Sequence, residues 1–257
     1  MSEARNISVP ERSASGLGLV RRSVWGYMAL MCLAQLAAAL IFFQGARVLI
    51  YLGFAFPWSL LVGYLLAANV HLLYTPEGRP LDKLNLATRV TLVRVLAIPL
   101  VFMLIVEGRM ETAGWVFFVA ALTDWLDGFL ARRMNEVTQL GRMVDPSIDA
   151  VICFFTFAAL FTAKHVPLWL MILVTLRYAI LLGGAISLKA ALGHLPMRAT
   201  FMGRLFYFIQ YGFLFFYLVL SGNMPKPPFL GALALVQLVV SGQLLGLGTS
   251  LYKEYRS

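Results

Sequence analysis

Long runs of apolar residues alternate with short polar connections along most of the chain. Eight of these runs approach or exceed the roughly 20 residues that a helix needs to cross a bilayer at about 1.5 Å per residue. Proline and glycine punctuate the connections, as in residues 75–80 and 222–228. The pattern predicts eight membrane-spanning helices at residues 24–43, 48–74, 88–106, 113–133, 142–163, 167–189, 200–221 and 228–250.

The composition agrees with a membrane protein and excludes an ordinary soluble domain. Of the 257 residues, 60% are hydrophobic and 13% are charged, whereas soluble domains carry about 25% charged residues. The net charge of +9 could suggest a nucleic-acid partner. However, fifteen of the cationic residues lie at the termini and on alternate connections, and only four lie on the other side: Arg47, Arg109, Lys164 and Lys226. This positive-inside bias predicts cytoplasmic termini and no nucleic-acid binding.

The predicted spans divide unevenly along the chain. Residues 1–22 are polar and lack the apolar segment of a cleavable signal peptide, which predicts a cytoplasmic tail. Residues 23–75 contain two spans without a charged residue inside them, and every charge within a span follows in residues 76–257. We therefore expect an all-α, polytopic helical bundle, with a six-helix catalytic core preceded by two accessory transmembrane helices.

Four aspartates stand at one end of two successive predicted spans. Asp124 and Asp127 are spaced i, i+3, and Asp145 and Asp149 are spaced i, i+4, so each pair occupies one face of a helix. A short polar connection makes the two helices antiparallel neighbours. The four carboxylates are therefore expected to converge near the cytoplasmic surface.

Such a group of carboxylates requires a compensating cation. A charged residue within a span costs a few kcal/mol, and a set of hard oxygen ligands without histidine or cysteine indicates Mg²⁺ or Mn²⁺. Four carboxylates can hold two ions about 3.5–4 Å apart, an arrangement suited to displacement at phosphorus. Small residues one turn from the acids leave room for a ligand: Gly128, Ala131 and Gly141.

The stretch from Asp124 to Asp149 resembles the signature of the CDP-alcohol phosphotransferase family, D-x2-D-G-x2-A-R-x8-G-x3-D-x3-D, at every fixed position. The resemblance implies a six-helix membrane domain, usually dimeric, with its active site open to the cytoplasm. It also implies that an alcohol displaces CMP from a CDP-linked donor, typically CDP-diacylglycerol. By the same resemblance, three aspartates bind the metals, and Asp149 is the base and a further metal contact. The matched positions that line the CDP site are Gly128, Ala131, Arg132 and Gly141.

A second similarity lies upstream, in the N-x2-T-x2-T-x2-R pattern formed by Asn85, Thr88, Thr91 and Arg94, followed by Pro99. It resembles the first core helix of bacterial phosphatidylglycerophosphate synthases, and it adds the asparagine and the two threonines to the expected donor site. The same subgroup commonly has a lysine after the last aspartate, where this chain has Ala150. It also has a second lysine in a later segment, where this chain has Phe206.

Two arginines lie inside apolar runs, where a cation requires an anion or a polar cavity. Arg94 could pair with one of the motif acids. Arg177 has no acid nearby in the sequence, which makes it a candidate for binding a phosphate on the acceptor. Arg198 and Arg204 are further candidates, although loop charges often face lipid headgroups.

These features favour a phospholipid synthase that uses CDP-diacylglycerol and, by the local motif and Arg177, glycerol 3-phosphate. Serine, inositol phosphate, choline or phosphatidylglycerol are alternative acceptors. A divalent-cation transporter is an alternative of another class, but its acids would be distributed along a pore. A structural protein of the same fold would not require the motif acids. We expect a homodimer in the bacterial inner membrane, in contact with its lipids.

Overall fold

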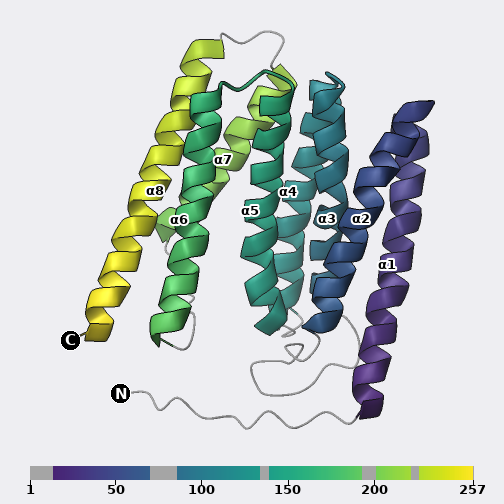
Figure 1. The fold of residues 1–257 in the computed structure, drawn as a ribbon, viewed down its shortest axis with the longest axis horizontal. Coiled ribbons are helices and arrows are strands. Elements are labelled where there is room, and N and C mark those ends of the chain that lie inside the picture. The colour runs from purple at the N-terminus through teal and green to yellow at the C-terminus, as the bar shows by residue number, and fades with distance from the viewer. Residues whose placement is uncertain (1–13, 70–85, 134–138, 193–200, 221–225, 257) are drawn as a thin grey trace. The chain divides into compact units, whose positions relative to one another are not determined.

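The computed structural model describes residues 14–69, 86–133, 139–192, 201–220 and 226–256. Within these ranges the chain forms eight helices and no strand. The helices are α1 (Ala14–Phe42), α2 (Ala46–Ala68), α3 (Leu86–Val106), α4 (Met110–Arg133), α5 (Gln139–Thr162), α6 (Leu168–Leu192), α7 (Phe201–Leu220) and α8 (Lys226–Arg256) (Figure 1). In α3 the side chains before Val93, and in α4 and α5 those of residues 124–147, lie outside this description.

The all-helical class and the order of the eight helices are confirmed, but α1 starts earlier than expected. It begins at Ala14, ten residues before the predicted start and inside the segment that we expected to be a tail. The predicted start was placed where the apolar run begins, but a helix can continue into a more polar segment if its turns are stabilised. Here Val20, four residues before the predicted start, is completely buried, so packing stabilises the helical turn around it.

Two helices are long and apolar enough to cross a membrane by themselves, at Val20–Phe42 in α1 and Ala46–Ala68 in α2. The other six contain apolar stretches of 10–17 residues within the described part of the chain. Large apolar side chains are exposed on several helices, including Ile41 at 75% and Leu182 at 64%. Apolar helices with outward-facing leucine and isoleucine suit a lipid environment, where a helix satisfies its own backbone hydrogen bonds.

The chain divides into two compact units, and three helices continue from one unit into the other. The first unit contains residues 1–100 and 119–152, and the second contains residues 101–118 and 153–257. The first unit therefore contains α1 and α2 together with the parts of α3, α4 and α5 on which the signature lies.

In the first unit, α1 packs along α2 (Figure 1). Gly45 has a positive φ of 58°, which allows the tight turn between the two helices. The buried Tyr51 hydroxyl donates a hydrogen bond to Gln35 Oε1 across the pair. One apolar cluster connects these helices to α3 and α5: its buried members are Val20, Val24, Met28, Met31, Leu66, Val95 and Ile148.

In the second unit, α8 packs against α6 and α7 (Figure 1). The start of α4 lies close to α7, because a Cβ added at Gly114 would come within 2.7 Å of Val219 and 3.0 Å of Leu218. The Phe117 and Tyr211 rings stack with their centroids 5.1 Å apart. A small residue and a pair of stacked aromatic rings thus bring the start of α4 and α7 together.

Candidate active site

The signature spans the end of one helix and the start of the next. Asp124 and Asp127 lie toward the end of α4, and Asp145 and Asp149 lie toward the start of α5. Both helix segments belong to the first unit. The helical backbone keeps each pair of positions on one face, as the spacing predicted. Of the four aspartate side chains, only that of Asp149 lies within the described part of the chain.

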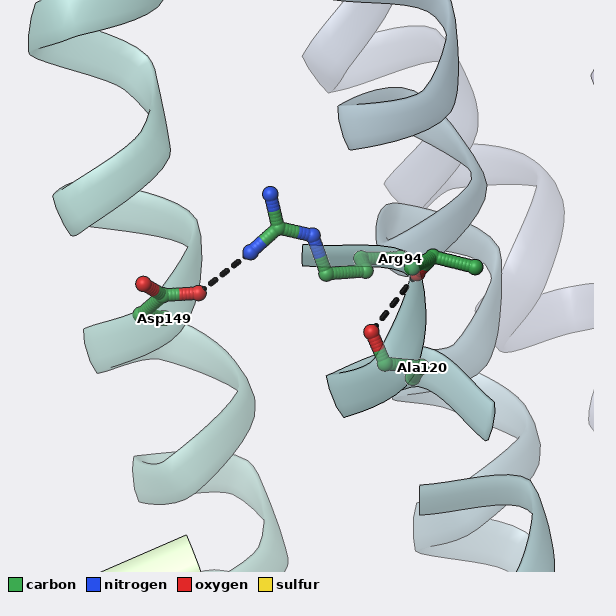
Figure 2. A network of polar contacts seen from close by, with 4 residues as sticks. Arg94, Ala120 and Asp149 are labelled. Atoms are coloured by element: carbon green, nitrogen blue, oxygen red, sulfur yellow. Dashed lines mark hydrogen bonds and ion pairs between the residues drawn. The ribbon is translucent and has the colours of Figure 1, made fainter. Parts of the chain in front are cut away.

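Asp149 is held by an arginine from a different helix. Arg94 on α3 donates from Nη1 to Asp149 Oδ1 at 2.5 Å (Figure 2). The arginine side chain is 1% exposed and the aspartate side chain 22% exposed. A charge-assisted hydrogen bond of this kind offsets both charges in an apolar environment. The expectation that Arg94 pairs with a motif acid is confirmed, and the acid is the proposed base.

The backbone beside this ion pair is packed against the two N-terminal helices. Val95 follows Arg94 and Ile148 precedes Asp149, and both are buried in the cluster shared with α1 and α2. In addition, Trp58 on α2 donates its indole N–H to the Val95 carbonyl oxygen at 3.1 Å. Sequence reasoning missed Trp58, because a tryptophan within an apolar span has no motif to distinguish it from a lipid-facing residue.

The start of the signature has a local hydrogen bond of its own. Thr123, immediately before Asp124, donates from Oγ1 to the Ala120 carbonyl oxygen at 2.6 Å. A threonine that bonds back to its own helix has its hydroxyl satisfied without a partner from another helix.

The remaining residues expected at the donor site are placed only in part. Thr88 and Thr91 lie on α3, and with Arg94 they recur every three residues along it, whereas Asn85 lies outside the described residues. The backbone of α4 and α5 also includes four matched positions whose side chains are not described: Gly128, Ala131, Arg132 and Gly141.

Arg177 lies in the second unit, on α6, and is 1% exposed. Its Nη1 donates to Gln237 Oε1 on α8 at 2.5 Å and also to Gln210 Oε1 on α7. Both glutamines are completely buried, and within the described part of the chain their Nε2 groups have no hydrogen-bond acceptor. Arg198 lies outside the described residues, as does the side chain of Arg204 on α7.

The residues present suit a hard divalent cation. Among the side chains that the structure describes, no three metal-binding residues come together, but three of the four aspartates are not among those side chains. The donor set of the signature consists of carboxylates, which Mg²⁺ and Mn²⁺ prefer. Asp149 is partly exposed rather than enclosed by its arginine, so its carboxylate remains within reach of a ligand.

Known proteins provide an independent test of the resemblance. The family model for CDP-alcohol phosphatidyltransferase matches residues 84–243, more than half of the chain. A CMP-forming cardiolipin synthase of Streptomyces coelicolor is 31% identical over 176 residues, which are 66% of this chain and 78% of that enzyme. A CDP-diacylglycerol–glycerol-3-phosphate 3-phosphatidyltransferase of Escherichia coli K12 is 40% identical over 109 residues. That match covers 41% of this chain and 57% of that enzyme.

Proposed function

Because the chain belongs to the CDP-alcohol phosphatidyltransferase family, we propose that it transfers the phosphatidyl group of CDP-diacylglycerol to glycerol 3-phosphate. The family makes it a transferase of phospholipid biosynthesis. The observation that carries the proposal is the complete signature on α4 and α5, whose last aspartate is paired with Arg94. The products are phosphatidylglycerophosphate and CMP.

The reaction exchanges one phosphorus–oxygen bond for another. The acceptor hydroxyl attacks the phosphatidyl phosphorus, its proton passes to Asp149, and the bond to CMP breaks. Asp149 suits the role of base because it is an accessible carboxylate held in place by a buried partner. Arg94 fixes the orientation of that carboxylate through Nη1 and offsets its charge.

We assign the divalent cations to the carboxylates of Asp124, Asp127, Asp145 and Asp149. Two bound Mg²⁺ or Mn²⁺ ions would supply positive charge to the pyrophosphate of the donor and to departing CMP. The donor nucleotide is assigned to the small and polar positions around these acids: Asn85, Thr88, Thr91, Gly128, Ala131, Arg132 and Gly141.

The acceptor phosphate is assigned to Arg177, with Arg198 and Arg204 as further candidates. The contacts of Arg177 support this proposal, because the buried Nε2 groups of Gln210 and Gln237 lie beside it without an acceptor in the described part of the chain. A phosphate has enough oxygen atoms to accept hydrogen bonds from a guanidinium and from both amides. Their burial implies that the acceptor would enter between helices rather than bind at a surface.

Phosphatidylglycerol is the second candidate acceptor, and a specific observation favours it. The match to the CMP-forming cardiolipin synthase covers more of this chain than the match to the glycerol-3-phosphate enzyme. Cardiolipin would form if the free hydroxyl of phosphatidylglycerol attacked the same donor. Ala150 and Phe206, which replace lysines expected for the glycerol-3-phosphate subgroup, are compatible with this acceptor.

We further propose that the enzyme is a homodimer of the bacterial inner membrane with its active site facing the cytoplasm. The excess of cationic residues at the termini and on alternate connections supports this orientation.

The acceptor is tested with purified protein, CDP-diacylglycerol and Mn²⁺, challenged separately with glycerol 3-phosphate, phosphatidylglycerol, serine, inositol phosphate and choline. Lipid products are identified by mass. The proposal expects phosphatidylglycerophosphate as the main product. Cardiolipin formation without any phosphatidylglycerophosphate would reassign the acceptor and leave the transfer chemistry intact.

A further inference from the structure

Pro99 leaves a gap in the hydrogen bonding of α3. In a regular helix, the carbonyl oxygen of residue 95 would accept a hydrogen bond from the N–H of residue 99. Pro99 lies inside α3 and is buried, and a proline has no N–H to donate. The Val95 carbonyl therefore cannot be satisfied by its usual partner within the helix.

The N-terminal helix pair provides the missing donor. The indole N–H of Trp58 on α2 lies 3.1 Å from the Val95 carbonyl oxygen and donates to it. In an apolar environment without water, an unsatisfied carbonyl is costly, so a donor from a neighbouring helix has a large effect. Packing reinforces the contact, because Trp58 and Val62 of α2 lie against the cluster that contains Val95.

The turn that this hydrogen bond stabilises also carries Arg94. The arginine immediately precedes Val95, and its side chain reaches Asp149 on α5 (Figure 2). Ile148, next to Asp149, belongs to the same apolar cluster as residues of α1 and α2. The N-terminal pair thus contacts both helices beside the ion pair. The family match covers residues 84–243, so α1 and α2 lie outside the region that it describes.

We propose that Trp58 is a positioning residue for the transferase site, which completes the hydrogen bonding that Pro99 interrupts and thereby fixes Arg94 against Asp149. The inference rests on the proposed function, since it assigns the N-terminal helices a role in that reaction. In this proposal Trp58 is assigned no contact with substrate or metal, and it acts through its hydrogen bond to the Val95 backbone.

The test uses the full chain and a double-mutant cycle. Trp58→Phe removes the donor and keeps an aromatic ring, whereas Pro99→Ala restores a backbone N–H that can reach the Val95 carbonyl from within α3. We expect Trp58→Phe to lower kcat for CMP release about tenfold with little change in KM for CDP-diacylglycerol, and Pro99→Ala to abolish most of that loss in the double variant.

Tyr51→Phe is the matched control. It also removes one hydrogen-bond donor from an aromatic residue of α2, but that donor bonds to Gln35 within the helix pair. We expect Tyr51→Phe to lower the melting temperature and leave kcat unchanged. If Trp58→Phe affects kcat no more than Tyr51→Phe does, or if its loss is the same with and without Pro99→Ala, the positioning role is wrong.

Folding failure is also decisive. If Trp58→Phe cannot be purified in a folded form but the double variant with Pro99→Ala can, the role of the hydrogen bond is supported. If neither variant folds, packing of the indole ring rather than hydrogen-bond donation explains why Trp58 is needed. A wild-type protein without CMP release would refute the proposed function instead. In that case, a melting temperature lowered by Trp58→Phe and restored by Pro99→Ala would still support the contact.

Discussion

Arg94 and Arg177 are both 1% exposed and both lie within apolar helices, but their partners differ in charge. In the first unit, Arg94 pairs with the carboxylate of Asp149, a residue of the signature. In the second unit, Arg177 bonds to the neutral amide oxygens of Gln210 and Gln237. Burial alone therefore does not identify the role of an arginine within an apolar helix. The charge of its partner does: a carboxylate makes an ion pair, whereas neutral amides leave a site with several hydrogen-bond donors.

The two arrangements respond differently to mutation. Removing one member of an ion pair leaves an uncompensated charge, which is costly in a low-dielectric interior. Removing a guanidinium from between two amides leaves neutral polar groups, which cost less. We therefore expect substitutions at the ion pair of the first unit to lower kcat most, and substitution of Arg177 in the second unit to change mainly the KM for the acceptor.

The largest effect is expected from removal of the metal. Incubation with EDTA should abolish CMP release, and Mg²⁺ or Mn²⁺ should restore it, because the signature contains only oxygen ligands. Zn²⁺ serves as a comparison ion that prefers softer ligands. Full turnover in the presence of chelator would show that the aspartates of the first unit do not need a metal. The proposed difference in role between the two units would then be wrong.

Asp149→Asn should lower kcat about 10³-fold, within the range of roughly 10²–10⁴ for general acid–base catalysis. The amide retains the size of the carboxylate and an oxygen that can accept from Arg94, but it cannot take the proton of the acceptor. Binding of CDP-diacylglycerol, measured by calorimetry, should remain detectable. Turnover at the wild-type rate would show that the ion pair has only a structural role.

Arg94→Met should reduce both activity and stability. Breaking a fully buried ion pair costs roughly 3–5 kcal/mol, and we expect about 2 kcal/mol here because Asp149 is 22% exposed. A fall in kcat of about 100-fold should accompany this loss of stability. Arg94→Lys keeps the charge and should be intermediate in both respects. Full activity in the methionine variant would exclude a role for Arg94 in orienting Asp149.

Arg177→Ala should raise the KM for glycerol 3-phosphate about tenfold and change that for CDP-diacylglycerol little, because one charged hydrogen-bonding group is worth about 1.5–3 kcal/mol. Tyr178→Phe is the control, since its ring lies 5.4 Å from the Arg177 guanidinium and the substitution keeps that ring. An equal loss for both substrates together with a lower melting temperature would mean that Arg177 only joins α6, α7 and α8.

The sequence allowed the helices to be predicted more fully than the contacts between them. Apolar runs located all eight helices, because membrane spans must be long and apolar. They did not locate the start of α1, where the buried Val20 lies in a helical turn before the predicted span. The spacing of the aspartates placed them correctly on α4 and α5, since helical periodicity is local.

The partners of the buried polar groups could not be derived in the same way. Sequence reasoning left open which motif acid Arg94 would meet, and it did not identify Gln210 and Gln237 as partners of Arg177. It also did not connect Trp58 with Val95, which is 37 residues away in the chain. Such contacts depend on how the helices pack against one another, and the periodicity of a single sequence does not specify that packing. Pro99 was a usable signal, because a proline within a helix indicates a carbonyl that needs another donor.

If phosphatidyl transfer takes place at the aspartates of the first unit, CMP and phospholipid must form together, and the stoichiometry of the products tests this. Purified protein with CDP-diacylglycerol, Mn²⁺ and glycerol 3-phosphate is sampled over time, and CMP and new phospholipid are quantified by mass spectrometry. We expect CMP and phosphatidylglycerophosphate to appear in equal amounts with the wild-type chain, and both products nearly to vanish with Asp149→Asn. CMP release without a new phospholipid, or equal product formation by the two proteins, would contradict it.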